Sequence, residues 1–175
     1  MLVQAHQLQH LRWQVTQAVI KFFQKNMMAQ VGTLTAGLAF GGLAPPNTNS
    51  AATEEYDGTD WTSVNNMNTA RHGLEGTGTQ TAGLAFGGHD NKDESEEYDG
   101  TNWAEGDNLN TGRRFLASAG IQTSALAVGG NSPPRVAIAE SYNGSSWTEE
   151  PDMSTARNNF GGFGASSTAA LVAGG

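Results

Sequence analysis

The sequence contains no cysteine, few charged residues and no long apolar run. Without cysteine, the chain can form neither a disulfide framework, a thiolate metal site nor a cysteine nucleophile. Charged residues make up 15% of the chain, against about 25% in an average protein. Only 9 Lys and Arg stand against 17 Asp and Glu, which argues against nucleic-acid binding through a general basic surface. No run of about 18 or more apolar residues occurs, so no transmembrane helix is predicted.

Charge is divided between a basic N-terminal segment and an acidic remainder. Residues 1–31 carry no Asp or Glu, so all 17 acidic residues lie in residues 32–175. An apolar stripe at spacings of three and four predicts an amphipathic helix over residues 1–24. We expect this helix to attach the chain to a neighbour through Leu8, Leu11, Val15, Val19 and Phe22. Packing on the following domain and weak binding to a membrane surface remain alternatives. No signal peptide is predicted, because no apolar stretch precedes a small-residue cleavage site.

Residues 25–175 repeat a unit of 42 to 46 residues. One element ends in a glycine pair and occurs four times, beginning at Thr35, Thr81, Thr123 and Thr168. A second element ends in Trp and a third ends in Arg, and each occurs three times. The Trp and the Arg are 10 residues apart in all three copies.

Each unit predicts four short antiparallel strands. Leu84 and Phe86 alternate with small residues, which is the period of a strand whose small face admits a second sheet closely. Asp99-Gly100 predicts a two-residue hairpin turn before the last strand. Four such strands per unit are typical of a β-propeller blade. We therefore expect an all-β fold of about three and a half blades after the helix. Their ranges are about 25–66, 67–108, 109–152 and 153–175.

The glycine pair after an apolar strand, followed by Tyr, Trp and Met-x-x-x-Arg, resembles the kelch repeat. The resemblance covers residues 25–175 and implies a kelch-type propeller whose Arg-proximal strand is nearest the axis. The step from Tyr to Trp is shorter than is general in kelch repeats, which we interpret as a shortened outer hairpin. The compact unit is also similar to repeats in proteins encoded by marine bacteriophages, which implies a virion component of tail or fibre.

Three and a half blades fall short of the four or so that a closed propeller needs. The chain is therefore interpreted either as a structural fragment of a larger propeller or as an open arc completed by partner chains. In both cases the last strand offers an unpaired edge.

Residues that recur in every unit are expected to be structural. We predict ion pairs or backbone hydrogen bonds for the repeated acids and bases, which are Glu54, Glu96, Glu140, Arg71, Arg113 and Arg157. We predict packing anchors between blades for the repeated aromatic residues, which are Tyr56, Tyr98, Tyr142, Trp61, Trp103 and Trp147.

Binding is expected where the units differ, in the connection between the second and third strands. The most polar stretch consists of His89, Asp90, Asn91, Lys92 and Asp93. Its oxygens could bind a cation, but it lacks the spacing of an EF-hand loop, and a solvated loop is the simpler interpretation. Arg135, beside Pro133-Pro134, is a candidate contact for an anionic partner. The kelch resemblance implies that this face is the binding surface.

The sequence therefore predicts a non-enzymatic binding or assembly module without a metal or other cofactor. Its expected partners are a protein, neighbouring copies of itself or a glycan, in a virion or the cytoplasm. The resemblance also raises an enzyme related to galactose oxidase, but that family uses copper with a Tyr–Cys crosslink, which a chain without cysteine cannot form. No GxSxG, P-loop or HExxH motif is present.

Overall fold

The computed structural model describes residues 27–175, which form strands and connecting loops without a helix. The predicted helix over residues 1–24 lies outside these residues. Sixteen strands make three four-stranded antiparallel sheets and two hairpins. The all-β prediction is thus confirmed for the described part, in which no helix is long and apolar enough to cross a membrane.

Each four-stranded sheet is formed by strands from one stretch of the chain. The first sheet contains β1 (Ala29–Thr33), β2 (Ala36–Phe40), β5 (Thr53–Tyr56) and β6 (Trp61–Val64). The second contains β7 (Glu75–Thr79), β8 (Ala82–Phe86), β9 (Ser95–Tyr98) and β10 (Trp103–Glu105). The third contains β11 (Ala117–Ile121), β12 (Ser124–Val128), β13 (Ala139–Tyr142) and β14 (Trp147–Glu150). The C-terminal hairpin contains β15 (Phe160–Ser166) and β16 (Ala169–Gly174). A small hairpin of β3 (Leu43–Ala44) and β4 (Thr48–Asn49) lies in the loop before β5.

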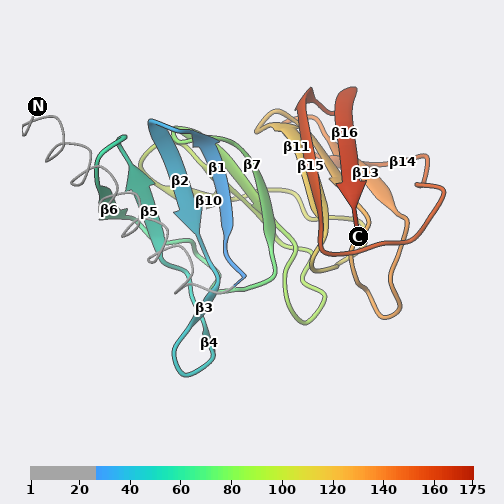
Figure 1. Ribbon diagram of the computed structural model, residues 1–175, viewed down its shortest axis with the longest axis horizontal. Helices are drawn as coiled ribbons and strands as arrows, with labels where there is room; N and C mark the ends of the chain where they lie inside the picture. The colour runs from blue at the N-terminus through green and yellow to red at the C-terminus, as the bar shows by residue number, and fades with distance from the viewer. Residues whose placement is uncertain (1–26) are drawn as a thin grey trace, which may run out of the picture.

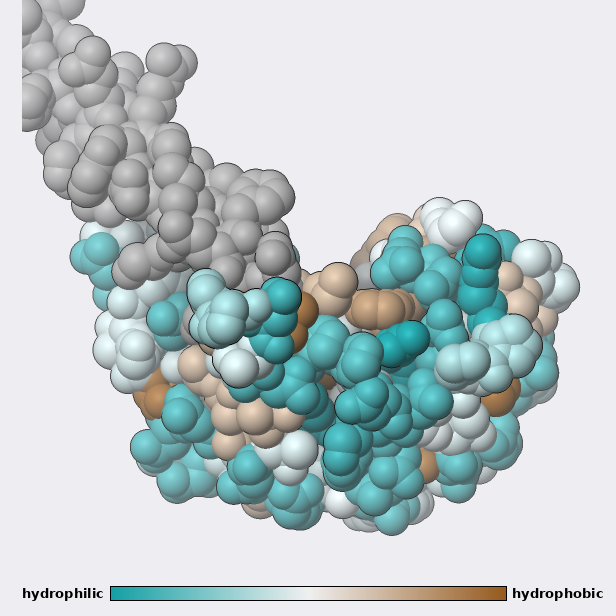
Figure 2. Space-filling model, turned by 90° about the horizontal axis from the view of Figure 1, so that it is seen from below, coloured by the Kyte–Doolittle hydropathy of each residue, from teal (hydrophilic) through white to brown (hydrophobic). Residues whose placement is uncertain are grey.

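The sheets follow one another side by side in an open arrangement that does not close into a ring (Figure 1). Their first strands, β1, β7, β11 and β15, contact one another in that order. Residues of all four strands line one hollow of about 220 Å³. Figure 2 shows an indented surface between the part with the first sheet and the part with the C-terminal hairpin. The first strand of each sheet is therefore the inner one.

Each sheet packs its bulky face on the glycine-bearing face of the next. A Cβ atom on Gly76 of β7 would lie 2.4 Å from the ring of Phe40 in β2. At Gly83 of β8, a Cβ atom would lie 3.0 Å from Leu38. The prediction that small residues permit close approach of a second sheet is confirmed, since larger residues at these positions would push the sheets apart.

The paired glycines end the second strand against the next unit. Gly42 N–H donates to the carbonyl of Arg71 at 2.9 Å, and Gly88 N–H donates to that of Arg113 at 3.0 Å. Gly87 has a φ of 68°, and a Cβ atom there would lie 2.5 Å from the Arg113 carbonyl oxygen. Both the backbone conformation and the space therefore require glycine at this position.

A second set of backbone hydrogen bonds joins the units near the starts of their first strands. Met27, Gly73, Phe115 and Asn159 occupy equivalent positions, and all have φ between 54° and 64°. Each of the last three donates its N–H to the carbonyl of the one before, at 2.9, 2.9 and 3.0 Å. The sequence gives little sign of this shared left-handed conformation, because only one of the four is glycine.

The turn predicted at Asp99-Gly100 is longer than two residues. Tyr98 pairs with Trp103, so Asp99–Asn102 form a four-residue loop. The Asp99 carboxylate accepts the N–H groups of Asn102 at 2.7 Å and Thr101 at 2.8 Å. These bonds lower the pKa of Asp99. Closure by the Asp side chain replaces the expected tight backbone turn.

Candidate binding sites

Four of the six repeated acids and bases form buried ion pairs, Arg71 with Glu96 and Arg113 with Glu140, which confirms the prediction for these four. In the second sheet, Arg71 Nη2 lies 3.0 Å from Glu96 Oε1, and both side chains are buried. Glu96 also accepts the backbone N–H groups of Asn68 at 2.6 Å and Thr69 at 3.1 Å. Burial raises the pKa of Glu96, and the amide of Asn68 and the charge of Arg71 oppose that rise. We call this set of one guanidinium and two backbone amides the carboxylate cradle.

The third sheet repeats the cradle. Arg113 Nη1 donates to Glu140, and both side chains are fully buried. Glu140 accepts the backbone N–H groups of Asn110 at 2.7 Å and Thr111 at 3.4 Å. Arg113 Nε donates to the carbonyl of Gly129 at 2.9 Å. These contacts therefore tie the segment that precedes each sheet's first strand to that sheet's third strand.

The third Met-x-x-x-Arg segment precedes the C-terminal hairpin and keeps the same anchoring. Met153 N–H donates to the Ala137 carbonyl at 3.0 Å. Leu109 and Met67, one and two units earlier, donate to the equivalent carbonyls of Asp93 and Ala51. Arg157 Nη1 donates to the Gly174 carbonyl at 2.9 Å. Within residues 27–175, no carboxylate contacts Arg157.

In the second and third sheets the repeated aromatic residues join each sheet to the one before it, which confirms their predicted role there. Trp103 Nε1 donates to Thr53 Oγ1 of the preceding sheet at 3.0 Å, and its ring lies 5.0 Å edge-on from Phe40. Trp147 Nε1 donates in the same way to Ser95 Oγ at 3.0 Å. The hydroxyl of Tyr98 donates to the Glu55 carboxylate of the preceding sheet at 2.8 Å. Tyr142 makes the equivalent bond to Glu97 at 2.7 Å.

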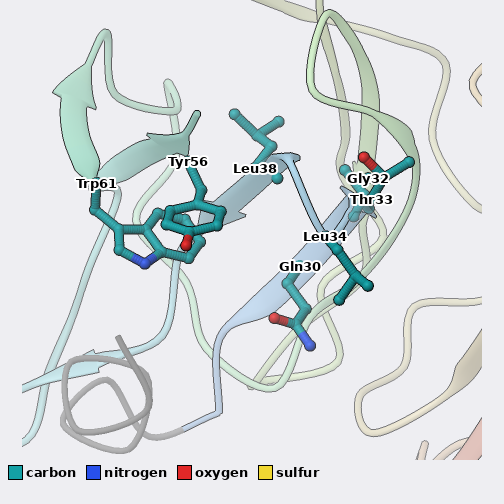
Figure 3. Close-up of a pocket in the computed structure, with 9 residues that line it drawn as sticks. Gln30, Gly32, Thr33, Leu34, Leu38, Tyr56 and Trp61 are labelled. Atoms are coloured by element: carbon teal, nitrogen blue, oxygen red, sulfur yellow. The ribbon is translucent and has the colours of Figure 1, made fainter. Parts of the chain in front are cut away.

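The first sheet presents the same aromatic residues in a groove of about 470 Å³, on the face that no other described sheet covers (Figure 3). Trp61 Nε1 has no hydrogen-bond partner among the described residues. Leu34, on the rim, is 93% exposed. The equivalent Gln80 donates to the Tyr56 carbonyl of the preceding sheet at 3.0 Å. This face therefore keeps the aromatic residues that anchor the other sheets. It has an exposed leucine where the second sheet has a glutamine bonded to the sheet before it.

Backbone hydrogen bonds join the predicted polar loop to the segment that leads to the third sheet. The Lys92 carbonyl accepts the N–H of Arg113 at 3.1 Å, and the Asp93 carbonyl accepts that of Leu109 at 2.9 Å. Lys92 Nζ lies 2.8 Å from Glu94 Oε1, while Asp90 and Asn91 both have positive φ. The loop thus positions the next unit. No group of three potential metal-ligating side chains forms within residues 27–175.

His89 joins a residue that the sequence analysis did not select. Its ring stacks on His72 at 4.4 Å, and its Nδ1 lies 2.8 Å from Asp90 Oδ1. His72 Nδ1 lies 2.6 Å from Asn49 Oδ1. Burial, followed by the neighbouring His89, lowers the pKa of His72. The available signal was that both histidines directly follow a repeated motif, at positions where the units differ.

Arg135 lies on the equivalent connection of the third sheet and is exposed. Its backbone forms a bridge with Asn131, which is in turn paired with Arg114. Among the described residues, no hydrogen bond or ion pair joins Arg135 to the loop at His89. The predicted loop residues therefore share a type of connection but form no single site.

The hollow lined by β1, β7, β11 and β15, which we call the central hollow, has one carboxylate in its lining, Glu75. The equivalent residues of the other complete units are Ala29 and Ala117. Burial raises the pKa of Glu75 from 4.5 to about 7. Ser118 Oγ lies 3.2 Å from Glu75 Oε1 and 2.8 Å from the carbonyl of Gly76. A hydroxyl has one hydrogen, so both contacts are best satisfied when a protonated Glu75 donates to Ser118. Comparison of the aligned units, rather than any motif, identifies this residue.

No protein-family model matches the chain, and no curated protein matches it in sequence.

Proposed function

We propose that the protein is a non-enzymatic assembly module, an open array of kelch-type propeller blades whose ends join it to other protein chains, copies of itself included. The main support is the first-sheet groove, where Tyr56 and Trp61 have no sheet to pack on among the described residues. The equivalent residues of the other sheets, such as Tyr98 and Trp103, anchor one sheet to the one before it.

The use of the repeated polar residues supports a structural module over an enzyme. Arg71 and Glu96 neutralise one another in the second sheet, and Arg113 and Glu140 do so in the third. Groups engaged in this way stabilise strands instead of facing a substrate. We therefore assign no catalytic residue.

The experiment measures the mass of the full chain by sedimentation velocity from about 1 to 100 µM, a range in which weak protein contacts are populated. We expect a defined oligomer. Leu34→Glu should lower the mass, because it places a charge on the rim of the groove. Ile121→Glu is the matched control, since Ile121 is also an exposed apolar residue but ends β11 in the third sheet and does not line the groove. A monomer at every concentration, or equal effects of the two substitutions, would contradict the proposal.

A further inference from the structure

We propose that the free edge of β16 binds an extended strand from a partner protein, and that this strand carries a glutamate two residues before an aromatic residue. The inference rests on the proposed role as an assembly module and names the partner chemistry at one end. Addition of a strand to a sheet edge is a common mode of peptide recognition.

The edge of β16 is unpaired among the described residues. β8 and β12 each lie between two strands, whereas β16 pairs only with β15. In the complete sheets the third strand places its glutamate opposite an alanine of the second strand, as in the pairs Ala85 with Glu96 and Ala127 with Glu140. The equivalent residue of β16 is Val172. A strand added in the same register would therefore place its glutamate opposite Val172.

That position lies beside the third copy of the carboxylate cradle. Ser154 and Thr155 correspond to the residues whose backbone amides bind Glu96 and Glu140, and Arg157 corresponds to Arg71 and Arg113. Within the described residues, neither amide has an acceptor. The bond from Met153 N–H to Ala137 shows that the segment is anchored as in the complete units. A carboxylate here would receive one charged donor and two backbone donors.

An apolar groove next to the cradle has room for the aromatic residue. Its volume is about 480 Å³. Its apolar lining comes from the third sheet, the segment after it and β16, namely Leu126, Val128, Ala139, Pro151, Met153, Ala170 and Val172. Glu150 and Asp152 also line it. One unit earlier, the equivalent space holds Tyr142 and Trp147, with the Trp147 ring 5.0 Å from that of Phe86. The groove and the cradle together define an acidic and aromatic strand as the occupant.

The aromatic residue of the partner need not be tyrosine. In the inner interfaces, a carboxylate at Glu55 or Glu97 accepts the tyrosine hydroxyl. Ser141 occupies this position in the third sheet, and its hydroxyl donates to Glu150 at 2.7 Å. The third sheet therefore offers no carboxylate at this position for a tyrosine hydroxyl, while the cradle for the partner's glutamate is kept. A phenylalanine in the partner strand should serve as well as a tyrosine.

The test uses the full chain and a fluorescein-labelled peptide with the sequence of residues 94–106, which contains Glu96 and Tyr98. Fluorescence anisotropy should show saturable binding. The same peptide with Glu96→Gln should bind at least about tenfold more weakly, because it loses the charge-assisted bonds. Arg157→Gln in the protein should cause a similar loss with the original peptide. Arg114→Gln is the matched control and should leave binding unchanged, because Arg114 lies over the Phe115 ring and lines neither the cradle nor the groove.

Three results would overturn the inference: no binding, equal binding of the Glu and Gln peptides, or equal effects of Arg157→Gln and Arg114→Gln. The Arg157→Gln protein and the Gln peptide together give an independent check. Once Arg157 is replaced, the change from the Glu to the Gln peptide should weaken binding only a little further. Measurement at a protein concentration below that of self-association separates this inference from the proposed function. A strictly monomeric chain that binds the peptide in a Glu-dependent way would refute self-assembly and support the strand site. A defined oligomer that does not bind the peptide, or that binds the Glu and Gln peptides equally, would support self-assembly and refute the strand site.

Discussion

Replacement of Glu140 by glutamine should remove much of the stability of the third sheet. The Glu140 carboxylate is fully buried and accepts bonds from Arg113 and from the backbone of Asn110 and Thr111. Glutamine fills nearly the same volume but leaves the Arg113 charge buried without an opposite charge. Removal of one partner of a buried ion pair costs about 3–5 kcal/mol. We expect a loss in this range, which is a large share of the roughly 5–15 kcal/mol that stabilises a typical domain.

The measurement is urea unfolding followed by tryptophan fluorescence, in which buried Trp147 reports on the third sheet. Glu149→Gln is the matched control, because Glu149 lies opposite Glu140 in the strand register but is exposed. It should change the free energy of unfolding by no more than about 0.5 kcal/mol. The combination of Arg113→Met with Glu140→Leu should be more stable than Glu140→Gln alone, because no unpaired charge remains. A loss below about 1 kcal/mol for Glu140→Gln would refute the assigned role of the pair.

Three further substitutions test the packing and the central hollow. The raised pKa of Glu75 means that the folded state holds its proton up to about pH 7, whereas the unfolded chain releases it near 4.5, so stability should fall across this range by at most about 3 kcal/mol. Glu75→Gln should remove that fall in unfolding measured from pH 4 to 8, and an unchanged pH profile would contradict the assignment. Gly87→Ala should lower the melting temperature through a loss of more than about 1 kcal/mol, whereas Gly161→Ala should not, since no atom lies within 4 Å of its added Cβ. Trp147→Phe should cost about 1 kcal/mol through loss of the bonds to Ser95 Oγ and the Asp107 carbonyl, while Trp61→Phe should lose no bond to a described residue, and equal losses in urea unfolding would count against the assignment.

The sequence predicts those features that recur at a fixed spacing. Leu84 and Phe86 alternate with small residues, and the structure has a strand there whose bulky face meets the next sheet. The pairing of Arg113 with Glu140 was predictable for the same reason, because both residues return in each complete unit. Recurrence marks what every sheet needs, even when the contact spans many residues.

Features that depend on one unit or on backbone conformation were not predictable in this way. Phe115 has a φ of 55°, which an aromatic residue seldom adopts, and its position is set by hydrogen bonds to neighbouring units. His72 and His89 meet only because two different loops lie at the same end of the second sheet. The shifted pKa of Glu75 arises from burial in a hollow that four separate strands create. Each of these features requires knowledge of how the units pack.

The bonds from glycine N–H groups to the arginine carbonyls of the next unit make the length of the array adjustable. Gly42 contacts Arg71 just as Gly88 contacts Arg113, so each junction presents the same backbone groups to the next. Removal of residues 71–112 would connect Ala70 directly to Arg113 and leave Gly42 facing an equivalent carbonyl. Such a shortened chain should still fold, and a chain with this stretch duplicated should carry one more sheet in the open array. Loss or gain of a single genetic unit could therefore change the span of the protein without any new interface.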